Sequence, residues 1–169
     1  IVVDELDGLQ KNIDHIKDIV EMQQNLAKVS GATEAFSLAN LMDDAVKLST
    51  SKSEDREIEL MRIYEDVPHI TAEKSKVLQI LVNLLRNAKQ ACNSVVDCKK
   101  QIILRVARQN NHIYISISDN GIGISAENLE RIFSHGFTTK KDGHGFGLHS
   151  SALSAKAMGG LLGVHSDGP

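Results

Sequence analysis

Hydrophobic residues near the start of the chain recur at alternating spacings of four and three residues, which is the pattern of a helix that packs against other helices. The seam within residues 1–30 consists of Val2, Leu6, Leu9, Ile13, Ile16 and Val20. A lone helix cannot bury such a seam, so we expect dimerisation or another helix beyond these residues. The alternative is an ordinary amphipathic helix that lies on the following domain. Ser30-Gly31 interrupts the pattern and predicts a domain boundary.

A helix, a strand and a long helix are predicted after this boundary. Ser37 precedes apolar residues at helical spacing and is the expected N-cap of the first helix. The run from Ile58 to Tyr64 alternates in the manner of a strand. The long helix is expected from Thr71, which could cap it, to about Val95. Its predicted buried stripe consists of Val77, Ile80, Leu81, Leu84, Leu85 and Ala88.

The second half of the chain reads as strands first and helices afterwards. Residues 101–108 and 112–118 predict an antiparallel hairpin with one buried face, and its second strand leads directly into Asp119. Ser125 is the expected cap of a short helix through Phe133. A further helix is predicted from residue 147 to residue 158, and residues 161–166 are expected to form a last strand.

Composition narrows the class of protein. The chain has 169 residues, of which 41% are hydrophobic, and this suits one globular domain with an appended element. A net charge of -3 gives no indication of nucleic-acid binding. No apolar run approaches the roughly 18 residues that span a bilayer. Cys92 and Cys98 form neither a disulfide framework nor a zinc-site pattern, so we expect two reduced thiols. Because the sequence starts at Ile1 rather than at Met, we interpret it as a piece of a longer protein.

The stretch from residue 118 to residue 148 carries the candidate chemistry. An ionised Asp119 can accept a hydrogen bond from an amino group such as that of adenine. Gly121 and Gly123 allow the backbone to pass close to a flat ring. A second cluster opens a helix and leaves backbone N–H groups for phosphates; its glycines are Gly143, Gly145 and Gly147. The polar residues 134–142 between the clusters predict a mobile lid. The pattern indicates a nucleotide site.

Three side-chain amides share one face of the long helix. Asn83, Asn87 and Gln90 are spaced by four and three residues. Because an amide oxygen is a suitable Mg²⁺ ligand, this face could hold a metal ion and phosphates. A merely solvated face is the alternative, and the spacing alone does not decide between the two.

Together these motifs resemble the catalytic, ATP-binding domain of sensor histidine kinases in the GHKL superfamily, which has the Bergerat fold. Residues 83–88 look like the N box, 119–124 like the G1 box, 133–140 like the F box and 143–148 like the G2 box, with Gly159-Gly160 as the closing glycine pair. The resemblance covers residues 36–169 and is closest to the nitrogen-regulation type. Residues 1–30 resemble the second helix of the preceding dimerisation and phosphotransfer domain.

The resemblance implies a fold and a set of roles. The fold would be α+β, a two-layer sandwich of a mixed sheet on three helices, preceded by the helix from a dimerisation hairpin and with a C-terminal strand missing. The cofactors would be ATP and Mg²⁺, with Asn87 and Asn83 as metal ligands and with Asn83 and Lys140 as catalytic residues. The implied ATP-binding residues are Asn87, Gln90, Asp119, Gly121, Gly123, Ile124, Phe133, Thr138, Thr139, Lys140, Gly143, His144, Gly145, Phe146, Gly147 and Leu148. The implied reaction is transfer of the ATP γ-phosphoryl group to a histidine.

Three departures from the family pattern qualify this expectation. The ATPases of the superfamily carry a Glu at the position of Asn83, and an amide cannot take a proton from water, so efficient hydrolysis is not expected. Many kinases carry a Lys at the position of Gln90. No phosphoacceptor motif is present, because every histidine lies elsewhere: His15, His69, His112, His135, His144, His149 and His165. We therefore expect ATP binding without self-phosphorylation.

The resemblance also implies partners and a location. A homodimer through the N-terminal helix and a response-regulator receiver domain are the expected partners, with no nucleic acid. The expected location is cytoplasmic, with any inner-membrane anchor in parent segments outside this sequence. Two other classes remain open: a GHKL ATPase or serine-kinase anti-sigma factor, and a degenerate module that binds a nucleotide or a partner kinase without catalysis.

Overall fold

The computed structural model describes residues 32–49, 58–95, 99–139 and 145–169. The predicted helix over residues 1–30 and the thiol of Cys98 lie outside these ranges and remain predictions. Among the described residues, none of the helices combines the length and the hydrophobicity that a transmembrane span requires.

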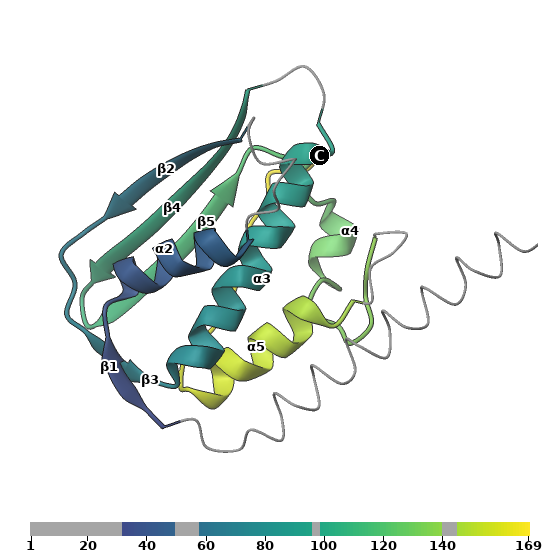
Figure 1. The fold of residues 1–169 in the computed structure, drawn as a ribbon. Coiled ribbons are helices and arrows are strands. Elements are labelled where there is room, and N and C mark those ends of the chain that lie inside the picture. The colour runs from purple at the N-terminus through teal and green to yellow at the C-terminus, as the bar shows by residue number, and fades with distance from the viewer. Residues whose placement is uncertain (1–31, 50–57, 96–98, 140–144) are drawn as a thin grey trace, which may run out of the picture.

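A three-stranded mixed sheet forms one layer of the molecule (Figure 1). Strand β4 (Lys100–Gln109) lies in its centre, parallel to β2 (Ile58–Tyr64) and antiparallel to β5 (His112–Asp119). The alternation of the hairpin therefore predicted both strands and their pairing correctly. Central β4 contributes Ile102, Leu104 and Val106, each with 0% of its surface exposed, to the face that meets the helices.

The helices cover one face of this sheet as a second layer. Helices α2 (Leu38–Ser49) and α3 (Lys74–Asn93) pack against each other and against β4, and α5 (Gly147–Ala157) packs on α3. A single turn of helix, α4 (Ala126–Leu129), lies outside this layer. The core between the layers consists chiefly of apolar residues from α2, α3 and β4, and its largest fully buried side chains include Leu38, Leu41, Met42 and Leu85. The predicted two-layer arrangement is confirmed.

The start of α3 differs from the prediction. Residues Ile70–Ala72 form strand β3, which pairs antiparallel with β1 (Glu34–Phe36) in a separate two-stranded sheet. Thr71 is therefore a strand residue and no helix cap; the helix begins at Lys74 after Glu73, whose side chain makes no capping hydrogen bond. The reason is tertiary, because pairing with β1 satisfies backbone groups that a longer helix would have used.

The buried stripe of α3 is close to the predicted one. Val77, Leu81, Leu85 and Ala88 are buried, whereas Ile80 and Leu84 are only half-buried. A charged residue joins the stripe: Lys89 is 6% exposed, and its ammonium donates to the backbone carbonyl of Ser49 at 3.1 Å. This bond satisfies a carbonyl at the end of α2 that has no partner within its own helix.

Two further local predictions are wrong. The helix after Ser125 ends at Leu129 and does not reach Phe133, since the chain continues as turns. Residues 161–166 form no strand. Leu161 is 95% exposed, and the segment runs towards the turn after β5, where Ser166 makes hydrogen bonds, without pairing with a strand.

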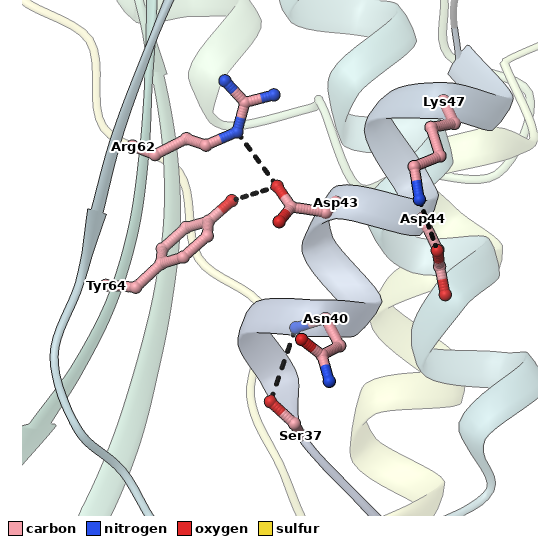
Figure 2. A network of polar contacts seen from close by, with 7 residues as sticks. All are labelled: Ser37, Asn40, Asp43, Asp44, Lys47, Arg62 and Tyr64. Carbon is pink, nitrogen blue, oxygen red and sulfur yellow. Dashed lines mark hydrogen bonds and ion pairs between the residues drawn. The ribbon is translucent and has the colours of Figure 1, made fainter.

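A polar network connects helix α2 to β2 at the edge of the sheet (Figure 2). The backbone N–H of Asn40 donates to the hydroxyl of Ser37 at 3.4 Å, so the predicted N-cap is confirmed. One turn later, Asp43 accepts hydrogen bonds from Arg62 at 2.9 Å and from the Tyr64 hydroxyl at 3.2 Å. Burial, followed by the charge of Asp43, raises the pKa of Tyr64 to about 12.

Candidate functional site

The site begins where β5 ends in Asp119. The residue is exposed as a whole, but protein atoms crowd its carboxyl group, and this loss of water raises its pKa. The N–H of Gly121 donates to the same carboxyl at 3.0 Å and opposes part of that effect. The carboxylate is thus oriented by the turn that follows it and keeps further acceptor capacity for a ligand.

The turn at Gly121 rests directly on helix α3. A β-carbon built on Gly121 would lie 2.4 Å from the carbonyl carbon of Ala91, and the N–H of Ile122 donates to the carbonyl of Ala91 at 3.3 Å. Only a residue without a side chain fits at this distance. The close approach therefore fixes the carboxyl end of β5 against the C-terminal half of α3.

Gly123 is held from the other side by the end of the described chain. It has a φ of +68°, and a β-carbon built on it would overlap the carbonyl oxygen of Gly168. The N–H of Ile124 donates to the hydroxyl of Ser166 at 2.9 Å. This turn therefore needs a glycine for its conformation as well as for its space.

Asn120 fastens the same turn to the beginning of β4. Its side-chain oxygen accepts from the N–H of Gln101 at 2.7 Å, and its side-chain nitrogen donates to the carbonyl of Lys99 at 2.7 Å. The Cys92 sulfur of α3 lies 3.9 Å from the same side-chain oxygen. Asp119 therefore lies between the paired end of β5 and the anchored Asn120, which gives its carboxyl a defined position.

The second glycine cluster contacts the first residues of the predicted lid. A β-carbon on Gly145 would lie 2.3 Å from the carbonyl carbon of Gly136. The rings of His135 and Phe146 are 4.9 Å apart, and His149 bonds to the carbonyl of Phe133 through Nδ1 at 2.9 Å. Thr138 is half-buried and Thr139 exposed at the end of this described part of the lid.

Helix α3 joins the two glycine clusters. Its Ala91 supports the first cluster, and its Asn83 lies against Gly147 of the second and donates to the Ser151 hydroxyl at 3.0 Å. Eight residues of helix separate the two supports, or about 12 Å along the axis. Asn87 lies between them and is half-buried.

One family profile covers more than half of the chain. The family of histidine kinase-, DNA gyrase B- and HSP90-like ATPases matches residues 72–168. The chain belongs to this family. The match includes α3, the hairpin and both glycine clusters, so the family assignment and the geometry concern the same residues. The recognised resemblance to the GHKL histidine kinases is confirmed.

Two similar proteins are kinases by name. The sensor histidine kinase ZraS of Escherichia coli K12 is 31% identical over 160 residues, which cover 94% of this chain and 34% of that protein. Sporulation kinase E of Bacillus subtilis is 26% identical over 131 residues, covering 77% and 17% of the two chains. The chain thus spans about a third of the length of the first of these curated relatives and less of the second.

Solved structures show the same fold. The catalytic domain of histidine kinase ThkA superposes with a TM-score of 0.65 at 24% identity, covering 76% of this chain and 82% of that one. A mycobacterial sensor histidine kinase, MprB, gives 0.64 at 18% identity over 76% and 81% of the two chains. Full-length ShkA in complex with AMPPNP gives 0.65 at 22% identity over 78% and 27%.

The predicted site residues divide into three groups. The turn with Asp119 and Gly121 lies against α3, whereas Gly123 lies against Gly168. Asn83 and Asn87 are half-buried on α3, and Gln90 lies on the same helix but is exposed. Gly145, Phe146, Gly147 and Leu148 form the start of α5 and the residues just before it. Lys140, Gly143 and His144 lie outside the described residues and remain predictions.

Sequence reasoning missed several supports of the site. Ala91, Asn120, Ser151 and Ser166 each contact a predicted site residue or its neighbour. Asn120 lies inside the first glycine motif, so its position was a usable signal. Ser166 and Ser151 contact partners 42 and 68 residues away, and no local pattern marks such contacts.

Proposed function

We propose that this chain is the ATP-binding catalytic part of a sensor histidine kinase, which transfers the γ-phosphoryl group of ATP to a histidine on a dimerisation helix. The observation that carries the proposal is that one helix, α3, supports an oriented carboxylate turn at Ala91 and a glycine turn at Asn83. Adenine would bind at the first support and the phosphates at the second. The sensor-kinase relatives and the AMPPNP complex of ShkA support the same assignment.

The amide residues fit a magnesium ion bound together with phosphates. Within the described part of the chain, no group of three or more His, Cys, Asp or Glu side chains could hold a metal ion. Mg²⁺ in phosphoryl-transfer sites takes one or two protein oxygens and completes its shell with phosphate oxygens and water. Asn87 is the ligand we propose, with Asn83 one turn earlier on the same helix. The ion would neutralise phosphate charge during transfer.

The remaining predicted residues have positioning roles in this proposal. Thr138, Thr139 and Lys140 would close over the nucleotide, with Lys140 beside the transferred group. The first cluster and Ile124 would enclose the adenine ring, and Phe133 would anchor the lid. Asn83 replaces the carboxylate that would activate water, so phosphate should pass to a histidine in preference to water. Gln90 would donate a neutral hydrogen bond to phosphate.

Partners follow from this activity and are proposed with it. Residues 1–30 would form a helix of the dimerisation domain, and residues 36–169 the ATP-binding domain. The phosphohistidine would donate its phosphoryl group to a response-regulator receiver domain. We propose no nucleic-acid partner, because the net charge of -3 does not favour binding to a polyanion. We place this part of the protein in the cytoplasm.

Calorimetric titration with AMPPNP, with and without Mg²⁺, tests the proposal. Asp119→Asn should abolish measurable binding, because an amide presents a donor as well as an acceptor where adenine needs an acceptor. Asp44→Asn is the matched control, since Asp44 is exposed on α2 and pairs only with a neighbouring Lys47 in the contacts described. Equal binding by Asp119→Asn and the parent chain would contradict the adenine assignment. Absence of binding by the parent chain would contradict the proposed function itself.

A second experiment tests the reaction. The chain is incubated with γ-labelled ATP, Mg²⁺ and a separate dimerisation domain that carries a phosphoacceptor histidine. Label should reach the histidine and should not accumulate on the chain alone. Release of free phosphate without labelled histidine would identify an ATPase, and binding without either product would identify a non-catalytic module.

A further inference from the structure

Helix α5 is attached to the molecule in an unusual way. Its one buried side chain is a serine, Ser151, which is 4% exposed. The apolar residue Leu153 on the same helix is 57% exposed. A surface helix normally buries an apolar stripe against its neighbour. The only fully buried side chain of α5 is polar instead, beside the half-buried Leu148, Ala152 and Ala155, and so the exact seating of the helix depends on how that hydroxyl is bonded.

The partner of this hydroxyl is the amide of Asn83 on α3. The side-chain nitrogen of Asn83 donates to the Ser151 oxygen at 3.0 Å. The other end of the same amide lies against Gly147, where a built β-carbon would be 2.5 Å from the Asn83 oxygen. Gly147 and Ser151 are four residues apart and so share one face of α5. The amide of Asn83 therefore occupies the space between them.

This arrangement fixes α5 in two respects. The absent side chain at Gly147 lets the helix approach the amide, and the hydroxyl one turn later sets the rotation of the helix about its axis. Both contacts lie in the first turns of α5, directly after Gly145. The backbone N–H groups at a helix start are the groups that bind phosphate. A small displacement of α5 would therefore misplace the phosphate end of the site while leaving the turn at Asp119 unchanged.

We propose that Ser151 is a positioning residue for phosphate binding: through the amide of Asn83, it seats the start of α5 on α3. The proposal rests on the proposed nucleotide function and adds a residue that lies outside every motif of the site. It assigns Asn83 a structural contact in addition to its place beside the metal ligand.

The test compares ligands that share adenine and differ in phosphate. Affinities for adenosine and for AMPPNP with Mg²⁺ are measured by calorimetry on the parent chain, Ser151→Ala and Ser151→Thr. Ser151→Ala should weaken AMPPNP binding about three- to tenfold, the effect of one hydrogen bond, and change adenosine binding less than twofold. Ser151→Thr keeps the hydroxyl and should recover most of the AMPPNP affinity. Ser150→Ala is the matched control, because the Ser150 hydroxyl bonds the Gly147 carbonyl within its own helix.

Each outcome decides the proposal. Equal losses for adenosine and AMPPNP would mean a general structural role, and an unchanged AMPPNP affinity in Ser151→Ala would mean no role; either result overturns it. If Ser151→Ala does not fold, Ser151→Cys keeps the volume with a weak hydrogen-bonding thiol, and the same selective loss is expected. A parent chain that binds neither ligand would refute the proposed function, which separates that failure from the failure of the Ser151 proposal.

Discussion

Adding one methyl group at Gly121 should damage the site, because the new carbon would collide with the backbone of α3. In Gly121→Ala the new β-carbon would lie 2.4 Å from the carbonyl carbon of Ala91, 2.6 Å from its β-carbon and 2.7 Å from its oxygen. Carbon atoms in contact prefer about 3.5 Å, so the turn must move by about 1 Å. Two of the three obstructing atoms belong to the backbone of α3, which cannot rotate away.

The expected cost follows from this overlap. Overpacking of this kind destabilises proteins by about 1–3 kcal/mol. For a chain of this size that corresponds to a fall of about 3–9 °C in the unfolding temperature. Because the displaced turn carries Asp119, AMPPNP affinity should fall at least tenfold in addition, since misplacement by about 1 Å is costly for positioned groups. Removing the Ala91 side chain as well should give little rescue, because the backbone atoms remain.

Thermal unfolding and calorimetric titration of Gly121→Ala check both numbers. Gly163→Ala is the matched control, because its built β-carbon meets nothing within 4 Å and its φ is not positive. The control should melt and bind like the parent chain. If Gly121→Ala also melts at the parent temperature and binds AMPPNP with parent affinity, the close packing of this turn on α3 is wrong.

Three other predictions test charge and packing. The pKa of Asp119 is raised in the folded chain, so the folded state loses stability as pH rises from the pKa of the unfolded chain through that of the folded chain. Asp119→Asn should therefore melt at a higher temperature than the parent at pH 7, although we expect it not to bind nucleotide. Melting curves should show that the difference vanishes near pH 3, where the carboxyl is protonated in both states. Asp43→Asn should move the pKa of Tyr64 from about 12 towards 10 in an ultraviolet phenolate titration, and an unshifted titration would contradict the contact. In the parent chain, the folded state should lose stability between about pH 10 and 12, where the phenol ionises in the unfolded chain before it does in the folded one. Leu104→Ala, at a position with 0% exposure, should cost about 2–5 kcal/mol in urea unfolding, whereas Leu153→Ala, at 57% exposure, should stay within about 0.5 kcal/mol; similar values for both would refute the assigned core.

Features set by near neighbours were predictable from the sequence. The strand at residues 58–64, the hairpin and the last helix agree with the structure to within a residue or two, because alternation and helical spacing report local burial. The cap at Ser37 was predictable for the same reason. The carboxylate of Asp119 and the glycines Gly121 and Gly123 lie close together because they belong to one short stretch of the chain.

Features set by distant partners were not predictable. Residues 70–72 became a strand because residues 34–36 pair with them, and three-residue strands are too short to show a period. The burial of Lys89 depends on the end of another helix 40 residues earlier. Residues 161–166 have the composition of a strand, but a strand also needs a partner edge, and the segment bonds to a turn instead.

The hydrogen bond between Ile124 and Ser166 has a consequence for the order of folding. Contacts between residues far apart in the chain form late, because closing the intervening loop costs entropy before the contact is made. The turn at Gly123 should therefore take its final shape only after α5 has docked on α3 and the segment behind it has crossed the molecule. Hydrogen exchange should report this: Ser166→Ala should speed exchange at the Ile124 amide and leave the amides of β4 protected. A newly synthesised chain would then hold its sheet and its long helix before it acquires the capacity to bind a nucleotide.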